Sequence, residues 1–222
     1  MAIELTPLWL SFKLATLTTL LLLIIGVPAA YALAFWKSRF KFLIEGVFSL
    51  PLVLPPSVLG FYLLMAFAPD SPLGTVIGNL FDYQLVFSFG GMVVASIIYS
   101  FPFMVQPVQT ALENLPASLR EAAYTLGKTR LQTFYYVLLP NIKTALLSGI
   151  VLSFAHTVGE FGVILMIGGN IPGKTRVASL AVYDSVESLN YSEAHFYSFI
   201  LLISSLIVIT LVYAINRRKN YV

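Results

Sequence analysis

The sequence contains no cysteine among its 222 residues, and charged side chains make up only 10% of it. The lack of cysteine excludes a disulfide framework and a thiolate metal site. Soluble domains carry about 25% charged residues, and a chain that is 58% hydrophobic has too little polar surface to cover a globule. The net charge of +3 is small and concentrated in loops, which argues against a nucleic-acid partner. These shortages indicate an integral membrane protein, a single domain over residues 1–222 in the lipid bilayer.

Long apolar runs are abundant in this chain. A hydrocarbon core about 30 Å thick needs about 20 helical residues. Five runs reach that length, so we expect an all-α fold with spans near residues 14–36, 46–69, 87–112, 144–168 and 196–216. Prolines 51, 55 and 56 favour a break in the second span that neighbouring helices relieve, and a bend that shapes the transport pathway is the alternative. A sixth, re-entrant segment at Val177 to Val186 is an open alternative, because this stretch is apolar but too short to cross.

Lysine and arginine are distributed unequally between the two sides of these spans. Lys13, Lys174 and Arg176 fall on one side. The other ten of the thirteen fall on the opposite side: Lys37, Arg39, Lys41, Arg120, Lys128, Arg130, Lys143, Arg217, Arg218 and Lys219. Cytoplasmic loops carry the excess of positive charge. The sequence therefore predicts an outside N-terminus, a cytoplasmic C-terminus and a cytoplasmic loop at residues 113–143.

The loop at residues 113–143 reads like part of a soluble protein. Pro116 suits the first turn of a helix, Gly127 suits a left-handed stop, and a second short helix can start after Thr129. Four residues at helical spacing form one stripe: Leu115, Leu119, Ala122 and Leu126. We therefore expect a helix, a glycine bend and a helix. A helix resting on lipid headgroups is the alternative, but the small alanines favour close docking of another protein.

The same loop carries a spaced motif. The letters EAA at Glu121, Ala122 and Ala123 are followed after three residues by Gly127, and after nine more by VLLP, which ends at Pro140. This pattern resembles the cytoplasmic loop of bacterial ABC-importer permeases, with valine where isoleucine is usual. The resemblance implies that these five residues belong to a coupling segment, which docks into a cleft of a separate ATPase subunit.

Three further stretches are similar to the family of molybdate permeases, and more loosely to tungstate and sulfate permeases: LPLVLPPSVLGFYLL (50–64), SFPFMVQPVQTALENLP (100–116) and FAHTVGEFGVILMIGGNIPGKTR (154–176). The resemblance implies an ABC type I importer transmembrane fold in the cytoplasmic membrane of a prokaryote. It implies four kinds of partner: a second copy of the chain, two ATP-binding subunits, an extracytoplasmic oxyanion-binding protein and the lipid bilayer. It also implies that this chain binds no cofactor, with ATP and magnesium on the partner ATPase.

One motif in the chain is misleading. Residues Gly168 to Thr175 satisfy the phosphate-loop pattern G-x-x-x-x-G-K-[ST]. Phosphate binding needs that loop between a buried strand and a helix, whereas this one follows an apolar span, contains Pro172 and faces outward. We therefore reject a nucleotide site. Lys174 and Arg176 are instead candidate cations of the outer mouth, where they attract a dianion or dock the binding protein. Ordinary interfacial anchoring is the alternative.

An acidic residue interrupts the fourth span. Glu160 is intramembrane by position, and such groups are functional candidates. His156 precedes it by four residues, so the two can meet on one helix face. Because a bare carboxylate would repel an oxyanion, we expect Glu160 to be structural or part of a gate, bonded to His156, to backbone N–H groups or to hydroxyls, or else protonated. A proton relay is the alternative.

The sequence leaves three classes of function to compare. We expect an ABC permease subunit without its own ATPase site, moving molybdate or tungstate. A sulfate-type permease is a second alternative, less favoured because those chains usually run longer. A stand-alone secondary transporter would often show paired broken helices in two repeats, and the sequence shows no such pair. A membrane enzyme would need a cluster of acids, histidines or nucleophiles at an interface, so we assign neither catalytic residues nor metal ligands.

Overall fold

The computed structural model describes residues 4–217, and all regular secondary structure in that part of the chain is helical. The bundle consists of α1 (Thr6–Phe35), α2 (Lys41–Val53), α3 (Pro56–Phe67), α4 (Pro72–Phe81), α5 (Phe89–Glu113), α9 (Lys143–Gly159), α10 (Gly162–Gly168), α11 (Ala178–Glu187) and α12 (Tyr191–Arg217). Between α5 and α9 lie four short helices: α6 (Ala117–Thr125), α7 (Arg130–Thr133), the π-helix η1 (Phe134–Leu138) and α8 (Leu139–Asn141).

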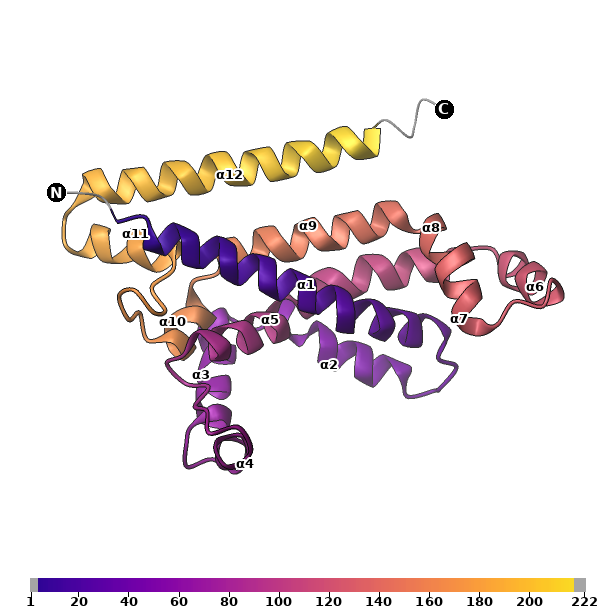
Figure 1. Ribbon diagram of the computed structural model, residues 1–222, viewed down its shortest axis with the longest axis horizontal. Coiled ribbons are helices and arrows are strands. Elements are labelled where there is room, and N and C mark those ends of the chain that lie inside the picture. Colours follow the sequence, from indigo (N-terminus) through magenta and orange to yellow (C-terminus); the bar gives the residue numbers. More distant parts are fainter. Residues whose placement is uncertain (1–3, 218–222) are drawn as a thin grey trace.

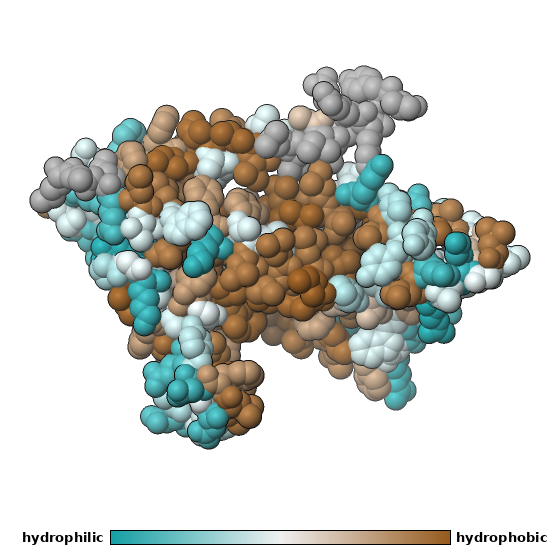
Figure 2. All heavy atoms as spheres, in the orientation of Figure 1, coloured by the Kyte–Doolittle hydropathy of each residue, from teal (hydrophilic) through white to brown (hydrophobic). Residues whose placement is uncertain are grey.

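The long helices run roughly side by side, and α6 and α7 lie at one end of the bundle, which we call the coupling end (Figure 1). Hydrophobic side chains dominate the middle of the molecule, while hydrophilic ones gather toward its two ends (Figure 2). Among the described residues, α1, α5 and α12 are long and apolar enough to cross a membrane alone, and two bent helix pairs raise the number to five if each pair is one span. Arg218 and Lys219 of the predicted basic tail lie outside the described residues.

The centre of the bundle is α5, which packs against α1 and α9. Met104 of α5 is fully buried. A Cβ added at Gly26 of α1 would lie 3.0 Å from Met104 Cγ, and one added at Gly149 of α9 would lie 3.1 Å from Met104 Sδ. The two glycines therefore let both helices approach α5 closely, as small residues do at helix contacts in membranes.

Two of the five predicted spans are not single helices, and this corrects the expected boundaries. The span predicted at residues 46–69 consists of α2 and α3, which meet at 114°. Pro55 and Pro56 lie at the junction, because proline cannot continue the hydrogen-bond ladder of the preceding helix. The span predicted at residues 144–168 is interrupted after Gly159, and α10 restarts at Gly162. The other three correspond to α1, α5 and α12.

The apolar stretch at 177–186 forms a helix, α11, of ten residues. At 1.5 Å per residue, such a helix is about 15 Å long and cannot cross a bilayer. It packs against α12 and α1, and the main-chain N–H of Ala178 donates to Ser11 Oγ at 2.8 Å. The segment is therefore a short helix held against the ends of two spans.

Candidate functional site

The coupling segment, α6 to α8, has the helix–bend–helix form that the sequence predicts. Pro116 is the N-cap of α6, and Gly127 has a φ of +74° in the bend. Thr129 begins α7 with a reciprocal cap: its Oγ1 accepts from the N–H of Gln132 at 3.2 Å, and its own N–H donates to Gln132 Oε1 at 3.0 Å. These local interactions fix the bend without help from the rest of the bundle.

The structure shows which side chains of α6 are free to contact a partner. Ala123 is only 4% exposed, since α6 packs against α7 and η1. Glu121 and Ala122 are exposed, and Leu126 is 80% exposed. Two residues of the predicted stripe, Ala122 and Leu126, are therefore free in this chain, whereas Ala123 does not belong to the free surface that a partner could contact. Glu121 and Ala122 do belong to it.

Pro140 lies where the coupling segment joins the membrane helices. It is exposed within α8, and the helical stretch Arg130–Asn141 meets α9 at 78°. Asn141 Nδ2 donates to the carbonyl of Val137 at 2.6 Å. α6 is thus connected through η1 and α8 to the start of α9, which is 17 residues long.

A polar cluster lies at the other end of α9. His156 Nδ1 is 2.9 Å from Ser100 Oγ of α5, and the same Oγ is 3.0 Å from Thr157 Oγ1. The imidazole ring lies between two aromatic rings of α5, with its centroid 4.7 Å from that of Tyr99 and 4.1 Å from that of Phe103. α5 therefore holds the histidine in a fixed orientation.

Glu160 lies at the break between α9 and α10 and is 6% exposed. Its Oε1 accepts from the main-chain N–H of Val163 at 2.9 Å, and its main-chain carbonyl accepts from Ser179 Oγ of α11 at 2.6 Å. Within the described chain Glu160 and His156 share no hydrogen bond, so the expected pair does not form. The carboxyl group instead satisfies a backbone donor that the broken helix leaves open.

Both residues nevertheless line one pocket of about 650 Å³, together with Pro56, Ser57, Tyr99 and the backbone around the break. A water molecule takes about 30 Å³ of liquid volume, so this space can hold a small solute with part of its water shell. Irregular backbone at membrane depth is found where it lines such a cavity. The pocket is therefore the best candidate for a piece of a transport pathway.

The two predicted outer-mouth cations have different surroundings. Arg176 Nη2 is 3.1 Å from Asp184 Oδ2, and its Nε donates to Asn170 Oδ1 at 3.2 Å. Arg176 is thus largely neutralised by α11. Lys174 is exposed and makes no ion pair or hydrogen bond through its side chain in the part of the chain that the structure describes. Of the two, only Lys174 is available to an anion.

The false phosphate loop is closed upon itself. Thr175 Oγ1 donates to the carbonyl of Gly168 at 2.6 Å and accepts from the N–H of Ile171 at 2.9 Å. The N–H groups of Lys174, Thr175 and Arg176 all point to the carbonyl of Ile171. Four N–H groups of the loop, those of Ile171, Lys174, Thr175 and Arg176, are therefore used within the turn and are not free for a phosphate. No three His, Cys, Asp or Glu side chains of residues 4–217 gather as a metal site.

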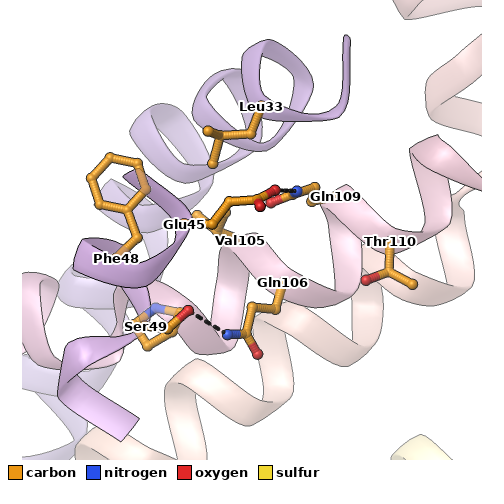
Figure 3. A pocket seen from close by; sticks show the side chains of 9 residues that line it. Leu33, Glu45, Phe48, Ser49, Val105, Gln106, Gln109 and Thr110 are labelled. Carbon is orange, nitrogen blue, oxygen red and sulfur yellow. Dashed lines mark hydrogen bonds between the residues drawn. The ribbon is translucent and has the colours of Figure 1, made fainter. Parts of the chain in front are cut away.

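Sequence analysis missed a polar pocket of about 190 Å³ between α1, α2 and α5 (Figure 3). Gln109 Nε2 donates to Glu45 Oε1 at 2.5 Å and to Glu113 Oε1 at 3.0 Å. Lys41 Nζ is 2.7 Å from Glu113 Oε1, and Gln106 Nε2 donates to Ser49 Oγ at 3.0 Å. The sequence did contain a signal, since polar residues at four-residue spacing lie at the start of α2 and at the end of α5. These bonds tie α2 to α5 near the coupling end.

Comparison with known proteins assigns the chain to a family. Residues 23–220 match the family described as binding-protein-dependent transport system inner membrane component. The molybdenum transport system permease protein ModB of Azotobacter vinelandii is 45% identical over 97% of this chain and 96% of its own length. The sulfate transport system permease protein CysT of Salmonella typhimurium is 34% identical over 89% of this chain and 70% of its own length.

The fold agrees with this assignment. The structure is similar, with a TM-score of 0.77 and 16% identity, to a bacterial alginate ABC transporter solved in complex with an alginate pentasaccharide-bound periplasmic protein. The similarity covers 97% of this chain and 78% of that one. The chain belongs to the family of binding-protein-dependent transport system inner membrane components and is a multi-pass permease subunit of an ABC importer, with the ATPase on a separate subunit.

Proposed function

We propose that this chain is the membrane-spanning subunit of an importer of molybdate, with tungstate accepted in its place. The observation that carries the proposal is the match to the molybdenum permease, which extends over 97% of this chain and 96% of the relative. The sulfate permease is the weaker alternative, because the chain covers only 70% of its length at lower identity.

The proposed assembly contains two copies of this chain, two ATP-binding subunits and an extracytoplasmic binding protein that delivers the oxyanion. ATP and magnesium belong to the ATP-binding subunits, and this chain holds no cofactor. The exposed face at Glu121 and Ala122 supports docking of an ATPase subunit. The lysine at 174, exposed at the opposite end of the bundle, supports attraction of the dianion.

The geometry offers a route from ATP to substrate. A displacement of α6 acts on η1, against which it packs, and η1 continues through α8 into α9. At 1.5 Å per residue, α9 carries that displacement about 25 Å to Gly159, beside the pocket lined by His156 and Glu160. Packed helices pass such shifts on as rigid bodies. ATP binding and hydrolysis would in this way alternate the access of the pocket.

The test of the substrate is the ATPase activity of the complete complex with its binding protein present. Molybdate and tungstate should each stimulate hydrolysis, and sulfate at the same concentration should not. Stimulation by sulfate alone would show that the chain belongs to a sulfate importer instead. Stimulation by none of the three, in a complex whose basal hydrolysis is intact, would overturn the oxyanion assignment.

A further inference from the structure

A cavity with a polar edge lies at the coupling end, away from the pocket of His156 and Glu160. Its volume is about 840 Å³. One wall is α1 from Pro28 to Phe35, continued by Trp36, and the other is formed by the coupling segment. The second wall includes an arginine of α6 and one of α7, Arg120 and Arg130.

The inner part of this cavity is apolar and reaches into the membrane zone. Pro28 lies seven residues before Phe35, which corresponds to about 10 Å along the helix. The ring of Tyr31 is 5.0 Å from that of Phe35 and 5.0 Å from that of Phe134, centroid to centroid. Tyrosine and tryptophan are enriched where a membrane meets water. The cavity therefore extends from that boundary toward the hydrocarbon.

The outer part of the cavity is positively charged. The guanidinium carbon of Arg120 is 4.0 Å from the centroid of the Phe35 ring, and Arg130 is exposed. Three carboxylates of the described residues form ion pairs, those of Glu45 and Glu113 with Lys41 and that of Asp184 with Arg176. No described carboxylate lies within 4.0 Å of the side-chain nitrogens of Arg120 or Arg130. Two guanidinium groups thus keep donors suited to the oxygens of a phosphate group.

We infer that this cavity binds an anionic phospholipid, with its phosphate at Arg120 and Arg130 and the first part of an acyl chain along Pro28 and Tyr31. A soluble ATPase surface would have to enter the apolar zone by about 10 Å to fill the same space. A free inorganic anion would leave the apolar wall uncovered. Because both arginines belong to the coupling segment, the lipid would contact the element that transmits ATP hydrolysis.

Trp36 lines the cavity, and Trp9 is the other tryptophan of the chain. The Trp9→Phe variant of the full chain is placed in phosphatidylcholine vesicles that contain a small fraction of brominated phosphatidylglycerol or brominated phosphatidylcholine. We expect brominated phosphatidylglycerol to quench the fluorescence of Trp36 at much lower mole fractions than brominated phosphatidylcholine does. This preference for the anionic lipid should fall about fivefold for each arginine removed.

Three variants distinguish lipid binding in the cavity from attraction to positive charge elsewhere on the surface. The Arg130 side chain makes no hydrogen bond or ion pair within the described chain, so Arg130→Gln should remove about fivefold of the preference without a folding defect, and adding Arg120→Gln should remove the rest. Arg39→Gln removes an exposed arginine that does not line the cavity and should keep the preference.

Three results would overturn the inference. The first is equal quenching by both brominated lipids in the parent chain, and the second is a preference that survives Arg130→Gln unchanged. The third is relief of quenching by millimolar glycerol phosphate or by added ATPase subunits, which would assign the cavity to a free phosphate or to the partner protein.

Discussion

Glu160 Oε1 accepts a hydrogen bond from the main-chain N–H of Val163 at 2.9 Å, and this bond closes the break between α9 and α10. Glu160→Gln retains an oxygen that can accept the bond, so the variant should fold and transport nearly as the parent does. Glu160→Ala leaves the donor unpaired and should cost about 1–3 kcal/mol. Assembly measured by thermal unfolding of the purified complex distinguishes the two variants.

The same pair of variants tests the alternative of a proton relay. A relay needs a group that releases a proton, which glutamine cannot do. A Glu160→Gln complex that is stable but takes up no oxyanion, together with parent uptake that an uncoupler abolishes, would contradict the structural role of Glu160.

The exposed face of α6 yields a second prediction. Ala122→Arg adds a bulky charge to a surface that is free in this chain, so the protein should reach the membrane at parental level yet lose its ATPase subunits and its transport. Ala117→Arg is the matched control, because Ala117 is also exposed on α6 but lies about 140° around the helix from Ala122. Co-purification of the ATPase measures docking. Full retention of the ATPase by Ala122→Arg would show that this face of α6 does not contact the ATPase.

For Ala123 we expect a different result from that for Ala122. Its side chain is buried within the chain, so Ala123→Arg should disturb the packing of α6 on η1 and lower the amount of folded protein. The amount of protein in the membrane should therefore be lower for Ala123→Arg than for Ala122→Arg when the two are measured side by side. Equal levels with equal loss of ATPase would show that both alanines face the partner.

Gly127 gives a third prediction that concerns the backbone alone. Its φ is +74°, and an added Cβ would meet no atom within 4 Å. Gly127→Val should strain the bend by about 1–3 kcal/mol and impair transport, whereas Gly127→Asn should be tolerated, because asparagine adopts the left-handed conformation more readily. Uptake by both variants at parental rates would mean that the bend has no need of this conformation.

The sequence predicted the coupling segment well because its determinants are local. Pro116, Gly127 and the cap at Thr129 act over three or four residues, and no distant contact is needed to form them. The free face of α6 was not predictable, because the burial of Ala123 depends on a π-helix that no local rule specifies. Spacing did place Ala122 and Leu126 on the docking stripe, and both are exposed.

In the membrane helices, too, local features were predictable from the sequence and features set by distant contacts were not. Pro55 and Pro56 indicated a break between two helices, but the angle of 114° depends on packing of α3 against α10. The break at Glu160 contains no proline, so the apolar run through it looked continuous. The pairing of His156 with Ser100 joins residues 56 positions apart, which helical spacing within one span cannot reveal.

Lys174 provides a fourth prediction, at the outer end of the protein. Lys174→Ala should leave basal ATP hydrolysis of the complex unchanged, since the loop donors around Thr175 are occupied within the turn. A defect is expected in uptake and should shrink as salt rises, because exposed charges are screened over about 8 Å at physiological ionic strength. Loss of ATP binding by this variant would restore the phosphate-loop interpretation.

Uptake of molybdate into proteoliposomes, with the binding protein outside and ATP inside, tests the central claim most directly. The account predicts uptake that requires ATP, the ATPase subunits and the binding protein, that tungstate inhibits and excess sulfate does not, and that Ala122→Arg abolishes. Uptake by this chain alone, driven by an ion gradient without the ATPase subunits, would contradict it.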